Sequence, residues 1–160
     1  MFTQHVVLLP YSFGTVERVL SDPGHPWTAG LDGAGGAELL ARVGVKVAGV
    51  PVYKHVKLEL AQPPLRIGSN RMLMSVSWHT SGGPPLFPVL EGHIEVEGAS
   101  AEQTTLSLKA NYAPPLGRLG RLVDRTLLRG LAQATVKDFV ERLAQALDVQ
   151  IRSSSQPAAQ

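Results

Sequence analysis

Alternation of apolar and polar residues between positions 41 and 112 is the sequence feature that most constrains the fold. Successive side chains of a β-strand point to opposite faces, so this pattern predicts strands with one buried face. Short segments rich in turn-forming residues separate the runs, which indicates hairpins and an antiparallel sheet. The apolar positions are Val43, Val45 and Val47; Val56, Leu58 and Leu60; Met72, Met74, Val76 and Trp78; Leu90, Ile94 and Val96; and Leu106, Leu108, Ala110 and Tyr112.

The segment that precedes these runs predicts a further strand and short helices. The segment from Gln4 to Leu9 is largely apolar and β-branched, which indicates a strand near residues 2–9 that ends before a proline. Ser12 can cap a short helix over residues 13–20. A second short helix fits either residues 27–31 or residues 37–40.

The segment that follows the runs predicts one long helix, because residues 116–147 contain no proline. A sheet of six strands is wider than a helix, which is about 10–12 Å across. The sheet must therefore curl around the helix, and curling leaves space between them. We expect a single α+β domain over residues 1–148, with a curved antiparallel six-stranded sheet around a long C-terminal helix. Residues 149–160 are low in apolar content and are expected to form a disordered tail.

Composition narrows the classes of function. The chain has no cysteine, which excludes disulfides, thiolate metal sites and cysteine nucleophiles, and fits a reducing compartment. Its formal net charge of +2 is too small to indicate a nucleic-acid partner. The sequence shows no signal peptide, and no window approaches the roughly 18 apolar residues of a membrane span. We therefore expect a cytoplasmic protein.

The order of the predicted elements resembles the helix-grip fold of the SRPBCC superfamily, which includes START-type lipid transfer domains and polyketide cyclase/dehydrase-like proteins. The resemblance covers residues 2 to about 147 and includes PYSFGTVERVLSDP near the start. It is most specific in YAPPLGRLGRLVDRTLLRGLAQATVKDFVERLAQAL, residues 112–147, which is similar to the C-terminal helix of actinobacterial-type members. The resemblance implies an apolar cavity under this helix that binds hydrophobic molecules. It implies no catalytic residue, because the superfamily shares no catalytic motif.

Large side chains on the predicted inner register are candidate ligand-binding residues. Lys54 shares the register of Val56, and if buried it could pair with a ligand carboxylate or act as a base with a depressed pKa. A bulge or a strand-end position would instead leave Lys54 in solvent. Core packing also explains the apolar and aromatic candidates. The complete set is Trp27, Lys54, Met72, Met74, Trp78, Tyr112, Leu127 and Phe139.

The predicted long helix carries two apolar stripes that a straight helix cannot bury on the same sheet. We expect either a bend near Gly130 or different packing of the two halves. An arginine face opposite the first stripe is either a solvated surface or a weak contact with an anionic membrane or a partner. The first stripe includes Leu116, Leu119, Val123, Leu127 and Leu131; the arginines are Arg118, Arg121, Arg125 and Arg129; the second stripe includes Val136, Phe139, Val140, Leu143 and Leu147.

Metal and nucleophile patterns are weak. Glu91, His93 and Glu95 share one face of a predicted strand, about 6.6–7 Å apart in succession. A polar outer face produces the same spacing, so we expect no metal ion and no cofactor. No Ser/His/Asp set, phosphate loop or dinucleotide fingerprint has a recognisable context.

The interior register between residues 43 and 112 favours binding over catalysis, because Lys54 and Tyr112 are its only ionisable residues. We expect a monomer or homodimer that holds a lipid, a polyketide or a quinone-like compound between the sheet and the C-terminal helix. One alternative is a polyketide cyclase or dehydratase-like enzyme that uses the same cavity. Another is a module that docks on a membrane or a partner through the arginine- and leucine-rich face of the helix.

Overall fold

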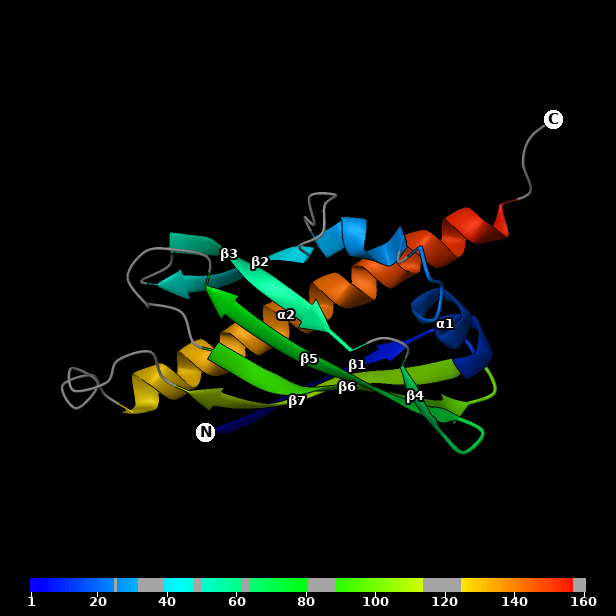
Figure 1. Ribbon diagram of the computed structural model, residues 1–160, viewed down its shortest axis with the longest axis horizontal. Coiled ribbons are helices and arrows are strands. Elements are labelled where there is room, and N and C mark those ends of the chain that lie inside the picture. Colours follow the sequence, from blue (N-terminus) through cyan, green and yellow to red (C-terminus); the bar gives the residue numbers. More distant parts are fainter. Residues whose placement is uncertain are drawn as a thin grey trace.

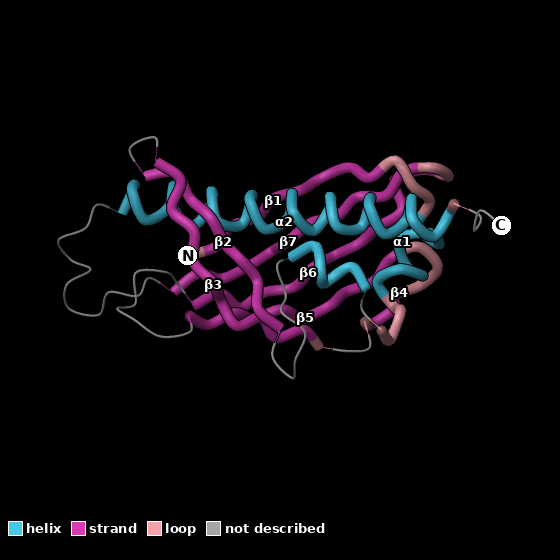
Figure 2. Tube along the Cα trace, turned by 90° about the horizontal axis from the view of Figure 1, so that it is seen from above, coloured by secondary structure: helices cyan, strands magenta, loops and turns pink. Residues whose placement is uncertain are grey.

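The computed structural model shows an antiparallel sheet along one side of a long helix, which runs nearly the length of the molecule (Figures 1 and 2). It describes residues 1–24, 26–31, 39–47, 50–61, 64–80, 89–113 and 125–156. The strands are β1 (Phe2–Leu9), β2 (Leu39–Val47), β3 (Val50–Leu60), β4 (Leu65–Ile67), β5 (Arg71–Thr80), β6 (Val89–Ser100) and β7 (Gln103–Ala113). The helices are α1 (Phe13–Leu20), the 3₁₀ helix η1 (Pro26–Leu31) and α2 (Arg125–Ser155).

The sheet has the strand order β1-β7-β6-β5-β3-β2, and every pairing is antiparallel. The short β4 lies off this path and pairs with β5. Both edge strands, β1 and β2, contact α2, so the sheet curves around the helix. The expected curved six-stranded sheet and long C-terminal helix are confirmed, with β4 as an addition.

Helix α1 follows β1 directly and closes one end of the core. The side chain of Ser12 accepts a hydrogen bond from the backbone N–H of Thr15 at 3.3 Å, which satisfies one of the free donors of the first turn. The buried residues of α1 are Phe13, Val16, Val19 and Leu20. The bounds predicted for this helix are confirmed.

Helix α2 continues to Ser155, so the expected end near Leu147 is too early. Ile151 is only 4% exposed and belongs to the hydrophobic core, which gives the last turns apolar contacts. The expected disordered tail is therefore wrong for residues 149–155, and residues 157–160 lie outside the described part of the chain.

The expected bend concerns the first half of the predicted helix. Residues 114–124 lie outside the described part of the chain, so the relation of the two apolar stripes stays a prediction. From Arg125 onward the helix continues through Gly130 without a break. The face packed on the sheet consists of the second stripe, and its buried members are Val136, Phe139, Val140, Leu143 and Leu147.

The inner face of the sheet forms the rest of the core, as the alternation predicts. Strands β6 and β7 leave no room for a side chain at Gly92, where an added Cβ would lie 2.3 Å from the backbone oxygen of Lys109. A residue without a side chain is therefore required at this point of the sheet. Across the described residues, no helix has the length and apolar character needed to span a membrane.

Candidate functional site

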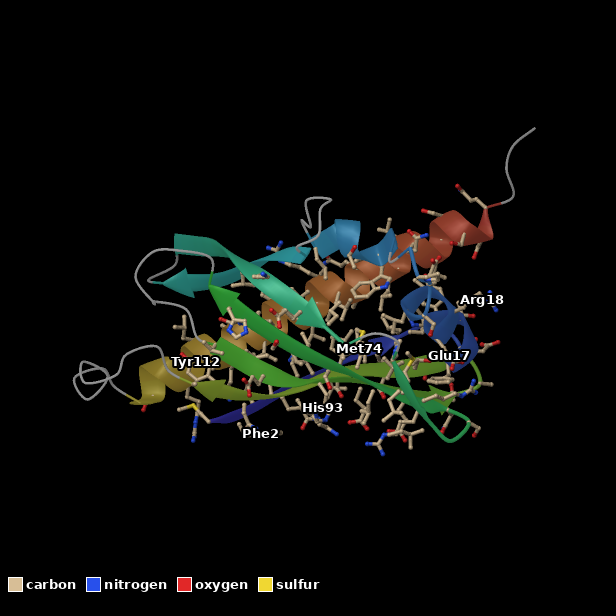
Figure 3. All side chains as sticks on the ribbon, viewed as in Figure 1. Phe2, Glu17, Arg18, Met74, His93 and Tyr112 are labelled. Carbon is tan, nitrogen blue, oxygen red and sulfur yellow. The ribbon has the colours of Figure 1, made fainter. Side chains whose placement is uncertain are left out.

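One row of large side chains crosses the inner face of the sheet opposite α2. Trp78 on β5 pairs with Leu90 on β6, and Leu90 pairs with Tyr112 on β7. These three side chains are at most 2% exposed. Phe139 of α2 covers Trp78, with ring centroids 5.1 Å apart and planes inclined by 58°. Figure 3 shows Tyr112 at the end of the sheet nearest the start of α2.

Three buried polar atoms near this row have no hydrogen-bond partner within the described part of the chain: Trp78 Nε1, Tyr112 Oη and Thr3 Oγ1. Thr3 is 5% exposed and pairs with Ala110, which is two residues before Tyr112 on β7. An unpaired buried polar group costs about 1–3 kcal/mol. Unpaired groups gathered on adjacent rows of an apolar surface are therefore candidates to contact a ligand.

Small side chains occupy the next row of the inner face. Val76, Gly92 and Ala110 pair across β5, β6 and β7, and Thr3 completes the row on β1. The following row is again large, since Met74 pairs with Ile94. Of the inner-face rows across β5, β6 and β7, this row therefore carries the least side-chain volume, and it lies beside the three unpaired polar atoms.

Burial keeps the phenol of Tyr112 in its neutral form. Desolvation raises the pKa of Tyr112 above its ordinary value. A neutral phenol both donates and accepts a hydrogen bond, whereas Trp78 Nε1 only donates. The candidate site therefore presents uncharged polar groups to a ligand, and at least the indole N–H of Trp78 must act as a hydrogen-bond donor.

The remaining candidates from the sequence divide by their location. Trp27 lies in η1, which contacts α2, and it is 1% exposed. The backbone of Lys54 pairs with Val43 of β2, but the side chains of Lys54 and Leu127 lie outside the described part of the structure. All other candidates are buried in the core, and their contact with a ligand stays a prediction: Trp27, Met72, Met74, Trp78, Tyr112 and Phe139.

Thr3 was missed by the sequence analysis. Its signal is the alternation of β1, in which Thr3 shares the inner register with His5, Val7 and Leu9 while its neighbours point outward. No local sequence pattern predicts that Thr3 lies beside Ala110, because this contact depends on the pairing of β1 with β7.

The structure describes only part of the arginine face predicted on the long helix. Arg118 and Arg121 lie outside the described residues, as does the side chain of Arg125. Arg129 is exposed on α2. Contact of these arginines with an anionic membrane stays a prediction.

The outer face of β6 carries an ion cluster where the sequence suggested only a polar surface. Glu95 is 5% exposed and forms ion pairs with Arg71 and Lys109, one on each of its carboxylate oxygens. Burial alone would raise the pKa of Glu95, but the hydrogen bond from Lys109 and the charges of both cations lower it overall. Both carboxylate oxygens of Glu95 are therefore already paired with the side chains of Arg71 and Lys109. No group of three metal-binding side chains is found among the described residues.

Replacement of Glu95 by Gln should lower the free energy of unfolding by about 1–2 kcal/mol at neutral pH, because two charge-assisted contacts are lost. A carboxyl with a lowered pKa stabilises the fold above its unfolded-state pKa, and this contribution is lost as the pH falls through the folded-state value. The difference between wild type and Glu95→Gln should therefore shrink below about pH 4.5. Urea unfolding between pH 3 and pH 7 measures it, with the exposed Glu91→Gln as the matched control. A difference independent of pH would contradict the ionic role.

Solved structures share the overall fold of this chain. A conserved protein from Geobacillus kaustophilus has a TM-score of 0.56 at 16% identity, over 94% of this chain and 97% of its own. The Zhui aromatase/cyclase from Streptomyces sp. R1128 has a TM-score of 0.56 at 15% identity, over 98% of this chain and 99% of its own. Norcoclaurine synthase from Thalictrum flavum, solved with dopamine and hydroxybenzaldehyde, has a TM-score of 0.52 at 14% identity, over 98% and 89%.

The chain has the helix-grip fold. These structures match nearly the whole chain, so the fold expected from the sequence is confirmed. No protein-family model matches the sequence, and no curated protein matches it. Identities of this size establish the fold alone, and the function has to be argued from the residues.

Proposed function

We propose that this helix-grip chain binds a hydrophobic small molecule between the inner face of the sheet and α2. The observation that supports the proposal is the group of buried polar atoms of Trp78, Tyr112 and Thr3, which have no hydrogen-bond partner among the described residues and lie on a largely apolar face. Ligand sites typically combine apolar walls with a few polar groups that fix orientation. The low side-chain volume at Gly92 and Ala110 lies directly beside these atoms.

Binding is favoured over catalysis in the same space. General acid–base catalysis needs a group whose pKa lies near the working pH. Tyr112 is the one ionisable side chain among the fully buried inner-face residues that the structure describes, and burial moves its pKa upward, away from neutrality. The aromatase/cyclase and the norcoclaurine synthase share the fold with this chain, but at these identities they do not transfer a reaction. A cytoplasmic location stays a prediction from the sequence.

The purified protein should retain an apolar molecule in native mass spectrometry, and solvent extraction should identify its chemical class. It should also bind the neutral apolar dye Nile red saturably at one site. Ala110→Leu adds side-chain volume beside Tyr112, so the affinity for Nile red should fall by roughly tenfold or more. Val149→Leu is the matched control, since Val149 is 64% exposed on α2.

Two results would count against the proposal. One is a wild-type protein that neither retains a molecule nor binds the dye. The other is an Ala110→Leu variant that keeps the wild-type circular dichroism spectrum and the wild-type affinity. The wild-type extraction does not depend on the folding of the variant, so the proposal remains testable if Ala110→Leu is unstable.

A further inference from the structure

We propose that the ligand of this site is uncharged and carries an oxygen that accepts hydrogen bonds, such as a ketone, a quinone or an aryl ketone, held by Tyr112, Trp78 and Thr3. This inference rests on the proposed binding function and goes beyond it by naming the chemistry of the bound end.

The first step is the donor inventory of the three unpaired groups. The indole N–H of Trp78 can only donate, and no partner satisfies it within the described part of the chain. The hydroxyls of Tyr112 and Thr3 donate or accept. A ligand that satisfies Trp78 must therefore present an acceptor, and a carbonyl oxygen has two lone pairs with which it can accept from two donors.

The second step is the placement of the three groups. Trp78 and Tyr112 stand on one row with a single strand between them, so their Cα atoms are about 9–10 Å apart. Thr3 stands on the next row, about 7 Å along the strand direction. All three side chains leave the same face of the sheet, and the small residues Gly92 and Ala110 lie among them. This spacing suits a ligand end that lies over the small residues, with donors on either side.

The third step is the charge of the surroundings. Trp78, Tyr112 and Thr3 are neutral, and burial keeps the phenol protonated. Two nearby groups can carry positive charge, and each already has an acceptor: the N-terminal ammonium of Met1 donates to the backbone oxygen of Tyr112 at 2.9 Å, and His5, two residues from Thr3, lies 3.8 Å from Glu141. A carboxylate placed among the three neutral groups would lose its hydration and would compete with these acceptors for a cation, which is unfavourable in an apolar site. The cation suggested by the sequence, Lys54, lies four residues along β3 from Leu58, the partner of Trp78, and so about 13 Å from that row. Neutral oxygen ligands therefore fit the row better than anionic ligands do.

The test compares probes of equal shape that differ only at the oxygen. One set consists of 2-acetylnaphthalene, 2-ethylnaphthalene and 2-naphthoate, and a second set consists of 2-dodecanone, dodecane and dodecanoate. Affinities are measured by displacement of Nile red from the wild-type protein. In the set that binds, the ketone should bind roughly tenfold more tightly than either the hydrocarbon or the carboxylate.

Variants assign the preference to named groups. Tyr112→Phe should reduce the advantage of the ketone over the hydrocarbon by roughly tenfold, and Thr3→Val should reduce it in the same direction. The melting temperature of the ligand-free Tyr112→Phe protein should be unchanged or higher, because an unpaired hydroxyl has been removed. Val149→Leu, at a position of α2 that is 64% exposed, is the matched control and should leave the ketone affinity unchanged.

The outcomes separate this inference from the proposed function. Equal affinity for ketone and hydrocarbon would overturn the neutral-oxygen inference while hydrophobic binding stands. A preference for the carboxylate that disappears in Lys54→Met would also overturn it, and would assign the polar contact to Lys54. If Nile red binds but no member of either set displaces it, the inference fails while hydrophobic binding stands. If the wild-type protein retains no molecule and binds neither Nile red nor any probe, both the inference and the proposed function fail.

Discussion

Replacement of Phe139 by Ala should lower the free energy of unfolding by about 3–5 kcal/mol, the usual cost of removing a large aromatic side chain from a core. Phe139 is 1% exposed and contacts Trp78, with a centroid distance of 5.1 Å. Its ring therefore joins the middle of α2 to β5, and its loss leaves a cavity that the rigid sheet cannot collapse to fill.

Urea unfolding followed by circular dichroism measures this effect. Val149→Ala is the matched control on the same helix, because Val149 is 64% exposed and its truncation should cost within about 0.5 kcal/mol. Phe139→Leu should fall between the two, since part of the volume is kept. A loss below about 1 kcal/mol for Phe139→Ala, with an unchanged denaturant slope, would show that the contact between α2 and the sheet does not depend on this ring.

Replacement of Gly92 by Ala should destabilise the protein by about 3 kcal/mol or more, which is beyond the usual cost of overpacking. The added Cβ would lie 2.3 Å from the Lys109 oxygen and 2.7 Å from the Ala110 Cα. Both are backbone atoms in a strand that pairs with β6 on one side and with β1 on the other, so neither can move without disturbing the sheet. Intrinsic propensity alone predicts the opposite sign, because Gly in a strand interior is about 0.5–1 kcal/mol worse than Ala.

Gly14→Ala in α1 is the matched control for this second prediction. A Cβ at Gly14 would meet no atom within 4 Å, so the same chemical change should stabilise the protein by about 0.5–1 kcal/mol. Thermal and urea unfolding of both variants give the two signs directly. If Gly92→Ala is as stable as the wild type, then β6 and β7 are not as closely apposed as the structure places them.

Much of the fold could be predicted because the relevant signals are local. The strand over residues 2–9 and the helix over residues 13–20 are confirmed with their bounds. Of the two alternatives for a second short helix, residues 27–31 correspond to η1, Pro26–Leu31, whereas Leu39 and Leu40 of the other alternative belong to β2. Period-two alternation, a serine cap and turn residues act over a few positions, and each can be identified without knowledge of the partner strand.

The predicted end of α2 near Leu147 was too early, because the last turns are stabilised by tertiary contacts. The sequence from Asp148 to Ser155 is polar apart from Val149 and Ile151, which by composition indicates a tail. In the structure, Ile151 packs in the core, and Asp148 accepts a hydrogen bond of 2.5 Å from Tyr11. Both residues contact parts of the chain that are distant in sequence, so the local sequence pattern could not predict these contacts.

The candidate site combines local and tertiary information. The sequence by itself determined that Trp78 and Tyr112 face the inside of a sheet, because alternation assigns each residue to a face. Only the tertiary structure brought Thr3 beside Ala110, and placed the Glu95 carboxylate between Arg71 and Lys109 on the other face. The physical reason is that side-chain direction follows from the backbone period, whereas neighbours across a sheet follow from strand order and register, which chain segments distant in sequence establish together.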